Sequence, residues 1–212
     1  MPDSTDTLIF DVEFARQQFP FFDFAQSDEW AFFDNAGGTF PCRPVVEKLE
    51  NFYRKNKVQP YGDNALAHAA GEQMDAGRKV ISELLGVAVD TITIGPSTTQ
   101  NLNTLSTACA GFLSKGDEII VSEQDHEANI GGWERVAKRT GATLHLWKIN
   151  ARDGELDLAD LEKLLNKNTR IVCVTHSSNI IGTVNPIDRI IDMGHSFGAK
   201  VIIDGVSFAP HR

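Results

Sequence analysis

The sequence predicts an α/β protein with a mostly parallel sheet and flanking helices, and two observations support this fold class. From about residue 75 onward, short apolar segments rich in Val and Ile alternate with amphipathic segments of helical length. Strands that alternate with helices form βα units, whose parallel strands are covered by helices on both faces. The composition, 42% hydrophobic and 23% charged, is that of an ordinary soluble globular protein able to bury a core.

The individual elements follow from the apolar periodicity and from the residues that begin and end each segment. The predicted strands lie at residues 91–95, 117–122, 143–149, 170–176 and 200–204. The predicted helices lie at residues 44–56, 72–86, 98–113, 129–141, 157–166 and 186–198. Asp157 is expected to cap the helix that it begins. The first 75 residues are otherwise irregular and rich in aromatic side chains.

Charge and cysteine content exclude several classes of partner. The net charge of −9 argues against nucleic acid or an anionic membrane as the main partner. No apolar run approaches transmembrane length, and the first residues lack the pattern of a signal peptide. Cys42, Cys109 and Cys173 are odd in number and far apart, and the last two are expected to be buried thiols. A reducing, cytoplasmic location is the simplest interpretation.

The start of the predicted helix at residues 98–113 is a candidate anion site. Ser97, Thr98 and Thr99 stand where free backbone N–H groups and the helix dipole favour negative charge. The alternative is a plain N-cap, for which Ser and Thr are also preferred. The segment lacks the Lys of a P-loop and the glycine spacing of a dinucleotide site.

Three further polar residues each follow a predicted strand. His126 and Asn179 lie a few residues past the predicted strands at residues 117–122 and 170–176. Asp204 is the last residue of the predicted strand at residues 200–204. Singly, these residues are explained by a solvated loop, a turn and a cap. Because the carboxyl ends of parallel strands lie at one edge of a sheet, we expect them to share one ligand. That ligand would carry a phosphate at one end and a group that requires a negative partner at the other.

The segments "GPSTT", "DHEAN", "THSSNIIGT" and "DGVSFAPH" occur in an order that resembles the class V aminotransferase group of pyridoxal phosphate (PLP) enzymes. Within this group the chain is most similar to the cysteine desulfurase-like branch, which includes selenocysteine lyase relatives. "FFDNAGGTFP" and residues 72–86 match the family's opening segments. The resemblance implies the PLP-dependent transferase fold type I. It also implies an N-terminal segment at 1–30 and an incomplete PLP-binding large domain at 31–212, with no C-terminal small domain.

The resemblance implies a role for each candidate site residue. The expected cofactor-binding residues are Ser97, Thr98, Thr99, His126, Asn179, Asp204 and Ser207, and the expected substrate-pocket residues are Asn35, Ala36 and Gly37. The three hydroxyl residues at the helix start would hold the phosphate, and Asn179 would bind the ring hydroxyl. His126 would stack on the ring and relay protons, and Asp204 would keep the ring nitrogen protonated. Ser207 stands where close relatives often have Gln or His.

Members of the family hold PLP through a lysine that follows the Asp strand by one further strand. The last lysine here is Lys200, at the other end of the strand and ~13 Å from Asp204. The family's substrate-binding arginine and nucleophilic cysteine also lie further along the chain. We therefore expect the N-terminal part of a longer enzyme, with an exposed apolar sheet edge, that is poorly stable and inactive alone.

The sequence thus predicts a PLP enzyme that removes sulfur from cysteine or a related small amino acid, as a homodimer. A class V transaminase or epimerase would use the same cofactor residues. A non-enzymatic, degenerate PLP-fold protein is a further alternative. A metal-dependent hydrolase would have to use His126, His176, Asp204 and His211, which lack the spacing of a metal motif. We therefore assign no metal site.

Overall fold

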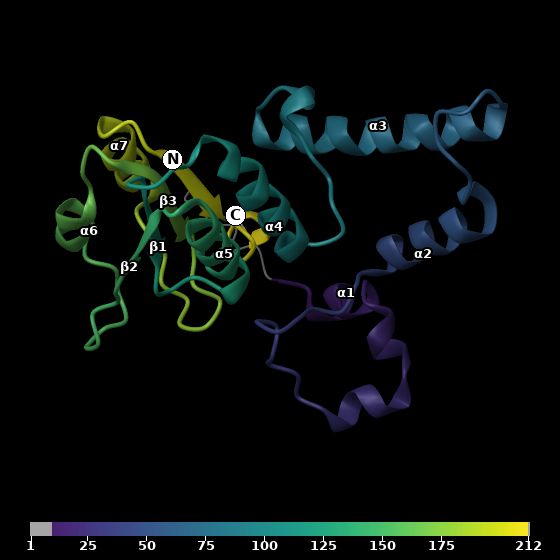
Figure 1. Ribbon diagram of the computed structural model, residues 1–212. Coiled ribbons are helices and arrows are strands. Elements are labelled where there is room, and N and C mark those ends of the chain that lie inside the picture. The colour runs from purple at the N-terminus through teal and green to yellow at the C-terminus, as the bar shows by residue number, and fades with distance from the viewer. Residues whose placement is uncertain (1–9, 212) are drawn as a thin grey trace, which may run out of the picture. The chain divides into compact units, whose positions relative to one another are not determined.

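A computed structural model describes residues 10–211, except for the side chains of Gln26 and Asp28. The chain divides into two compact units, Met1–Ile94 and Gly95–Arg212, and each is described by itself (Figure 1). Residues 1–9 of the expected N-terminal segment lie outside the described part. Within that part, no helix is both long and apolar enough to cross a membrane.

The second unit is built on a four-stranded sheet with the strand order β2-β1-β3-β4, and every neighbouring pair is parallel. Its strands are β1 (Glu118–Ser122), β2 (Thr143–Trp147), β3 (Thr169–Thr175) and β4 (Lys200–Asp204). These confirm the strands predicted in the second half of the chain. β4 is an edge strand whose Val201, Ile202 and Ile203 are only half buried.

Helices cover both faces of this sheet (Figure 1). They are α4 (Thr98–Cys109), α5 (Gly131–Thr140), α6 (Leu158–Leu164) and α7 (Ile187–Ser196). The unit also contains the short helices η5 (Ala110–Phe112), η6 (Glu127–Asn129) and η7 (Ala209–His211). α6 and α7 pack on one face, and α4 and α5 pack on the other. The predicted helices of this unit are confirmed, and Asp157 caps α6 by accepting a hydrogen bond from the Ala159 N–H group.

The alternation of side chains along β1 and β3 explains the two core layers. Ile120 of β1 points to the α6–α7 layer, whereas its neighbours Ile119 and Val121 point to the α4–α5 layer. All three are fully buried. Successive strand residues face opposite sides, so a sheet covered on both faces needs a continuous apolar run. Burying each such side chain stabilises the fold by roughly 1.5–3 kcal/mol.

A charged cluster fixes the turn that leads into β1. The Asp117 carboxylate accepts hydrogen bonds from the Ser114 N–H group at 2.9 Å and the Ser114 hydroxyl at 3.0 Å. It also accepts one from the Arg170 Nε at 2.8 Å, which ties the turn to β3. Burial alone would raise the pKa of Asp117. The hydrogen bonds and the positive charge of Arg170 outweigh this effect and lower the pKa below its ordinary value.

The predicted strand at residues 91–95 is wrong. The structure has a short helix, η4 (Val89–Thr91), followed by an extended segment that belongs to none of the described strand pairs. Ile94 is 60% exposed. The alternation of Thr and Ile suits a pleated surface, but a strand requires a neighbouring strand to supply hydrogen bonds, and this segment has none among the described residues.

The first unit is mostly helical. Its helices are α1 (Val12–Gln17), η1 (Pro20–Asp23), η2 (Ala25–Glu29), α2 (Arg43–Asn51), η3 (Phe52–Asn56), α3 (Ala65–Leu85) and η4. The helices predicted at 44–56 and 72–86 are confirmed. α3 begins earlier than predicted because the Asn64 side chain accepts a hydrogen bond from the Ala67 N–H group, and it ends at Gly86 with φ +65°.

Candidate functional site

The strand order places a crevice at the carboxyl ends of β1 and β3. These strands are neighbours, but the chain leaves β1 toward β2 and leaves β3 toward β4 on the opposite side. Loops that diverge in this way open a ligand site at the switch point of the sheet. A cavity of about 340 Å³ lies here, lined by residues 123–127 and 178–181 and by Ile149. His126 and Asn179 are thus brought together as predicted.

His126 immediately precedes the short helix η6 that follows β1. Its Nδ1 accepts a hydrogen bond from the Ala128 N–H group at 3.1 Å, and its side chain caps η6. A nitrogen that accepts a hydrogen bond carries no proton, so the proton of the neutral ring lies on Nε2. The exposed imidazole therefore offers an Nε2–H donor toward its surroundings.

Asp204 ends β4 with one carboxylate oxygen available. The residue is 8% exposed, and its Oδ1 accepts a hydrogen bond from the Val206 N–H group at 3.0 Å. Its Oδ2 makes no hydrogen bond to any described residue. The Asp204 backbone is fixed by β3, because its carbonyl oxygen accepts from the His176 N–H group at 2.9 Å. A rigidly held carboxylate with a free oxygen suits a cationic donor.

Asn179 and Ser207 lie in turns beyond β3 and β4. The turn of Asn179 is closed by a hydrogen bond from the Gly182 N–H group to the Ser178 carbonyl at 3.0 Å, with Gly182 at φ +74°. The predicted turn is therefore confirmed. Ser207 is half buried beside Phe208, whose ring stacks on His176 with centroids 3.5 Å apart. The Ser207 contact with a ring hydroxyl stays a prediction.

The segment before α4 has the local geometry of an N-cap. The Ser97 hydroxyl accepts a hydrogen bond from the Gln100 N–H group at 3.2 Å, so the plain-cap interpretation holds for this side chain. A Cβ atom at position 95 would collide with the Asn101 side-chain oxygen, so a larger residue than Gly95 requires Asn101 to shift. α4 packs against η6, which begins just after His126. An anion at the Thr98 and Thr99 amides stays a prediction.

A buried polar network was missed by the sequence analysis. The Gln124 side chain donates to the Gly154 carbonyl and accepts from the Asn185 Nδ2 at 2.9 Å. Asn185 also donates to the Thr175 carbonyl at 2.8 Å. Loops that follow β1, β2 and β3 are thereby joined at the strand ends. The signal was the run of polar residues in "SEQDHEAN", of which only His126 was selected.

Asp125, the residue before His126, is the most perturbed acid of the site. Burial raises its pKa from 3.8 to about 6, and the negative charge of Asp204 adds to this effect. Hydrogen bonds from the Ser122 hydroxyl and from the Asn129 Nδ2, the latter at 2.7 Å, oppose it. Asp204 pairs with Thr175 at the end of β3, so it lies at the sheet edge from which the Asp125 loop also emerges.

The predicted substrate-pocket residues lie in the first unit. Asn35, Ala36 and Gly37 form an exposed turn, in which the Gly37 N–H group donates to the Asp34 carbonyl at 3.1 Å. The Asn35 side chain donates to the Thr39 hydroxyl at 3.4 Å. Asn35 also borders an aromatic-lined cavity of about 310 Å³. Their role toward a substrate stays a prediction.

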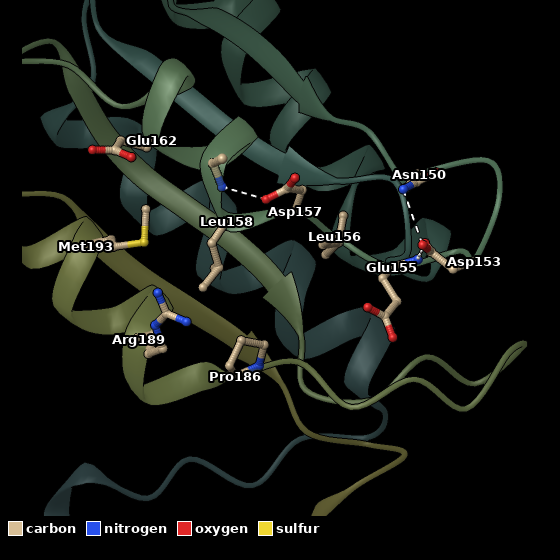
Figure 2. Close-up of a pocket in the computed structure, with 11 residues that line it drawn as sticks. Asn150, Asp153, Glu155, Leu156, Asp157, Leu158, Glu162, Pro186, Arg189 and Met193 are labelled. Carbon is tan, nitrogen blue, oxygen red and sulfur yellow. Dashed lines mark hydrogen bonds between the residues drawn. The ribbon is translucent and has the colours of Figure 1, made fainter.

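A larger cavity, of about 790 Å³, lies between α6 and α7 and contains none of the predicted site residues (Figure 2). Its lining includes several carboxylates and a single cation, Arg189. Among residues 10–211, no three or more His, Cys, Asp or Glu side chains are grouped so that they could hold a metal ion.

The family model described as aminotransferase class-V matches residues 31–212. The chain belongs to the aminotransferase class-V family. A probable cysteine desulfurase of Mycolicibacterium paratuberculosis is 34% identical over 96% of the chain and 30% of its own length. The aminotransferase-like protein FGM3 of Gibberella zeae is also 34% identical, over 96% of the chain and 50% of its own length.

The fold is likewise shared with solved structures of cysteine desulfurases. The cysteine desulfurase CsdA of Escherichia coli is 30% identical, with a TM-score of 0.80 over 96% of the chain and 50% of its own chain. The resemblance to cysteine desulfurase-like enzymes of PLP fold type I is therefore confirmed. The chain spans half or less of the length of these proteins.

Proposed function

We propose that this class-V chain is the cofactor-binding part of a PLP-dependent enzyme that removes sulfur from cysteine or a related small amino acid. The observation that carries the proposal is the crevice at the switch point. It brings His126 and Asn179 to one cavity, at the sheet edge where Asp204 ends β4. The desulfurase names of several relatives support the choice of reaction.

The residues present fit PLP chemically. Asp204 offers a carboxylate oxygen, free of hydrogen bonds to described residues, to a protonated ring nitrogen. α4 is 12 residues long, and the first N–H groups of such a helix have no intrahelical partners and suit a phosphate. Asn179 supplies an amide at the cavity for the ring hydroxyl. When bound, PLP acts as an electron sink for negative charge at the substrate carbon.

His126 would have two tasks. Its imidazole would lie against the ring face, in an orientation fixed by the Ala128 hydrogen bond. The same bond keeps the proton of the neutral ring on Nε2, from which it can be passed to a neighbouring group. The substrate, the sulfur acceptor, the homodimer and the cytoplasmic location belong to this proposal, as do the roles of Ser207 and of residues 35–37. The need for a lysine outside this chain belongs to it as well.

A class V transaminase is the second candidate. It is favoured by the fungal relative, which is called aminotransferase-like and is as identical to the chain as the bacterial desulfurase relative. Both reactions would use the same cofactor-binding residues. Assay of the intact parent protein with cysteine, for sulfide and alanine, against amino-group transfer to a keto acid separates the two.

The cofactor proposal is tested with pyridoxamine 5′-phosphate, which has no aldehyde and therefore cannot react with surface lysines. We expect saturable binding to the 212-residue chain, followed by cofactor fluorescence. Asp204→Asn should weaken this binding at least about tenfold, since it removes the charge opposite the ring nitrogen. The matched control is Asp192→Asn, an exposed carboxylate on α7. Equal binding by both variants, or no binding by the unsubstituted 212-residue chain, would overturn the proposal.

A further inference from the structure

Asp125 holds the turn that presents His126. Its carboxylate accepts hydrogen bonds from the Ser122 hydroxyl at the end of β1 and from the Asn129 side chain, at 2.7 Å for the latter. The Asn129 backbone N–H group in turn donates to the His126 carbonyl at 2.8 Å. His126 is therefore held by a closed loop of hydrogen bonds in which the Asp125 carboxylate is the central acceptor.

The Asn129 side chain makes this arrangement sensitive to charge. Asn129 is fully buried, and its Oδ1 has no hydrogen-bond partner among the described residues. A buried acceptor without a hydrogen-bond partner destabilises the folded state. With Asp125 ionised, the amide donates to it. With Asp125 protonated, a flipped amide would let Oδ1 accept the carboxyl proton. The two protonation states of Asp125 thus favour opposite orientations of Asn129.

Two titratable groups act on Asp125 from neighbouring strands. Asp204 on β4 repels its negative charge, and the buried Cys173 thiol on β3 lies close enough for the Asp125 charge to raise the cysteine's pKa further, beyond the effect of burial. On its own loop, Asp125 has three other titratable neighbours, the exposed residues Glu123, His126 and Glu127. Asp125 follows β1, whose neighbour β3 pairs with β4, so the three strands end at the same edge of the sheet.

We propose that Asp125 is a positioning residue, whose hydrogen bonds hold the turn of His126 and whose charge state changes the electrostatic environment of Asp204. This inference rests on the cofactor role proposed above and extends it. A cation bound at Asp204 attracts the ionised form of Asp125. By linkage, ionised Asp125 must then bind such a cation more tightly than its protonated form does. The Asp125 contribution to cofactor affinity therefore increases as the pH rises through the range in which this carboxyl ionises.

The binding experiment measures pyridoxamine 5′-phosphate affinity from about pH 5 to about pH 8 for the chain and for Asp125→Asn. The affinity ratio of the chain to this variant should rise roughly three- to tenfold over that range. Asp125→Glu, which keeps a carboxylate, should retain most of the rise, whereas the ratio of the chain to Asp192→Asn should stay constant. A ratio that does not change with pH for Asp125→Asn would overturn the inference.

A measurement without cofactor keeps the inference separate from the proposed function. Nuclear magnetic resonance should show an inflection near pH 6 in the Asp204 carboxyl carbon and in the Asn129 side-chain amide. Asp125→Asn should abolish both inflections. If the chain fails to bind pyridoxamine 5′-phosphate but shows both inflections, the cofactor proposal fails, whereas the coupling of Asp125 to Asp204 and Asn129 stands. If the inflections persist in the variant, Asp125 does not control either group.

Discussion

The buried Asp125 carboxyl should make the stability of the second unit depend on pH in a way that Asp125→Asn removes. The asparagine keeps the shape of the side chain but cannot ionise, and its amide can accept from only one of the two donors, Ser122 and Asn129, unless the other reorients. Burial raises the pKa of Asp125 from 3.8 to about 6 in the folded chain. A difference of about two pH units corresponds to ~3 kcal/mol of differential stability.

Whether the stability rises or falls with pH follows from the direction in which the pKa of Asp125 is shifted. Because the folded pKa lies above the unfolded one, the folded state binds more protons between the two values. The contribution of Asp125 to stability is fully present below about pH 4 and is lost as the pH rises through about 6. The free energy of unfolding of Asp125→Asn, relative to that of the parent chain, should therefore increase by ~3 kcal/mol from about pH 3.5 to about pH 7.5.

Urea unfolding followed by tryptophan fluorescence measures this difference. Trp133 and Trp147 are both fully buried in the same unit as Asp125, so their emission reports its unfolding. Asp192→Asn, on the exposed side of α7, serves as the control and should show no such trend. A difference between Asp125→Asn and the parent chain that stays constant across this pH range would refute the reasoning.

Three further predictions concern the sheet and its surroundings. Leu161→Ala, at a fully buried position of the α6–α7 layer, should lower the free energy of unfolding by about 2–5 kcal/mol in urea. The pKa of Asp117 is lowered, so its contribution to stability should vanish as the pH falls below about 4, a loss that acid titration of Asp117→Asn should not show. Gly95→Ala should lower the free energy of unfolding by about 1 kcal/mol because Asn101 must shift, and adding Asn101→Ala should recover most of this loss in the same assay.

Much of the fold was predictable because its signals are local. Continuous apolar runs such as the one around Ile119 and Ile120 can be buried only where both faces of a strand are covered. Asp157 could be assigned as a cap from its position before an amphipathic segment. Residues 91–95 show the limit of such signals, because their alternation is compatible with a strand but no neighbouring strand pairs with them among the described residues.

The sequence by itself determined the fold class, the family and the edge of the sheet at which polar side chains gather. Strand order was decided only by the tertiary structure, since it depends on contacts between residues far apart in the chain. Only the pairing of β1 with β3 brings the loops of His126 and Asn179 to one cavity. Burial was decided in the same way. Asp125 carries no local sign of a raised pKa, which arises because neighbouring strands exclude water from it.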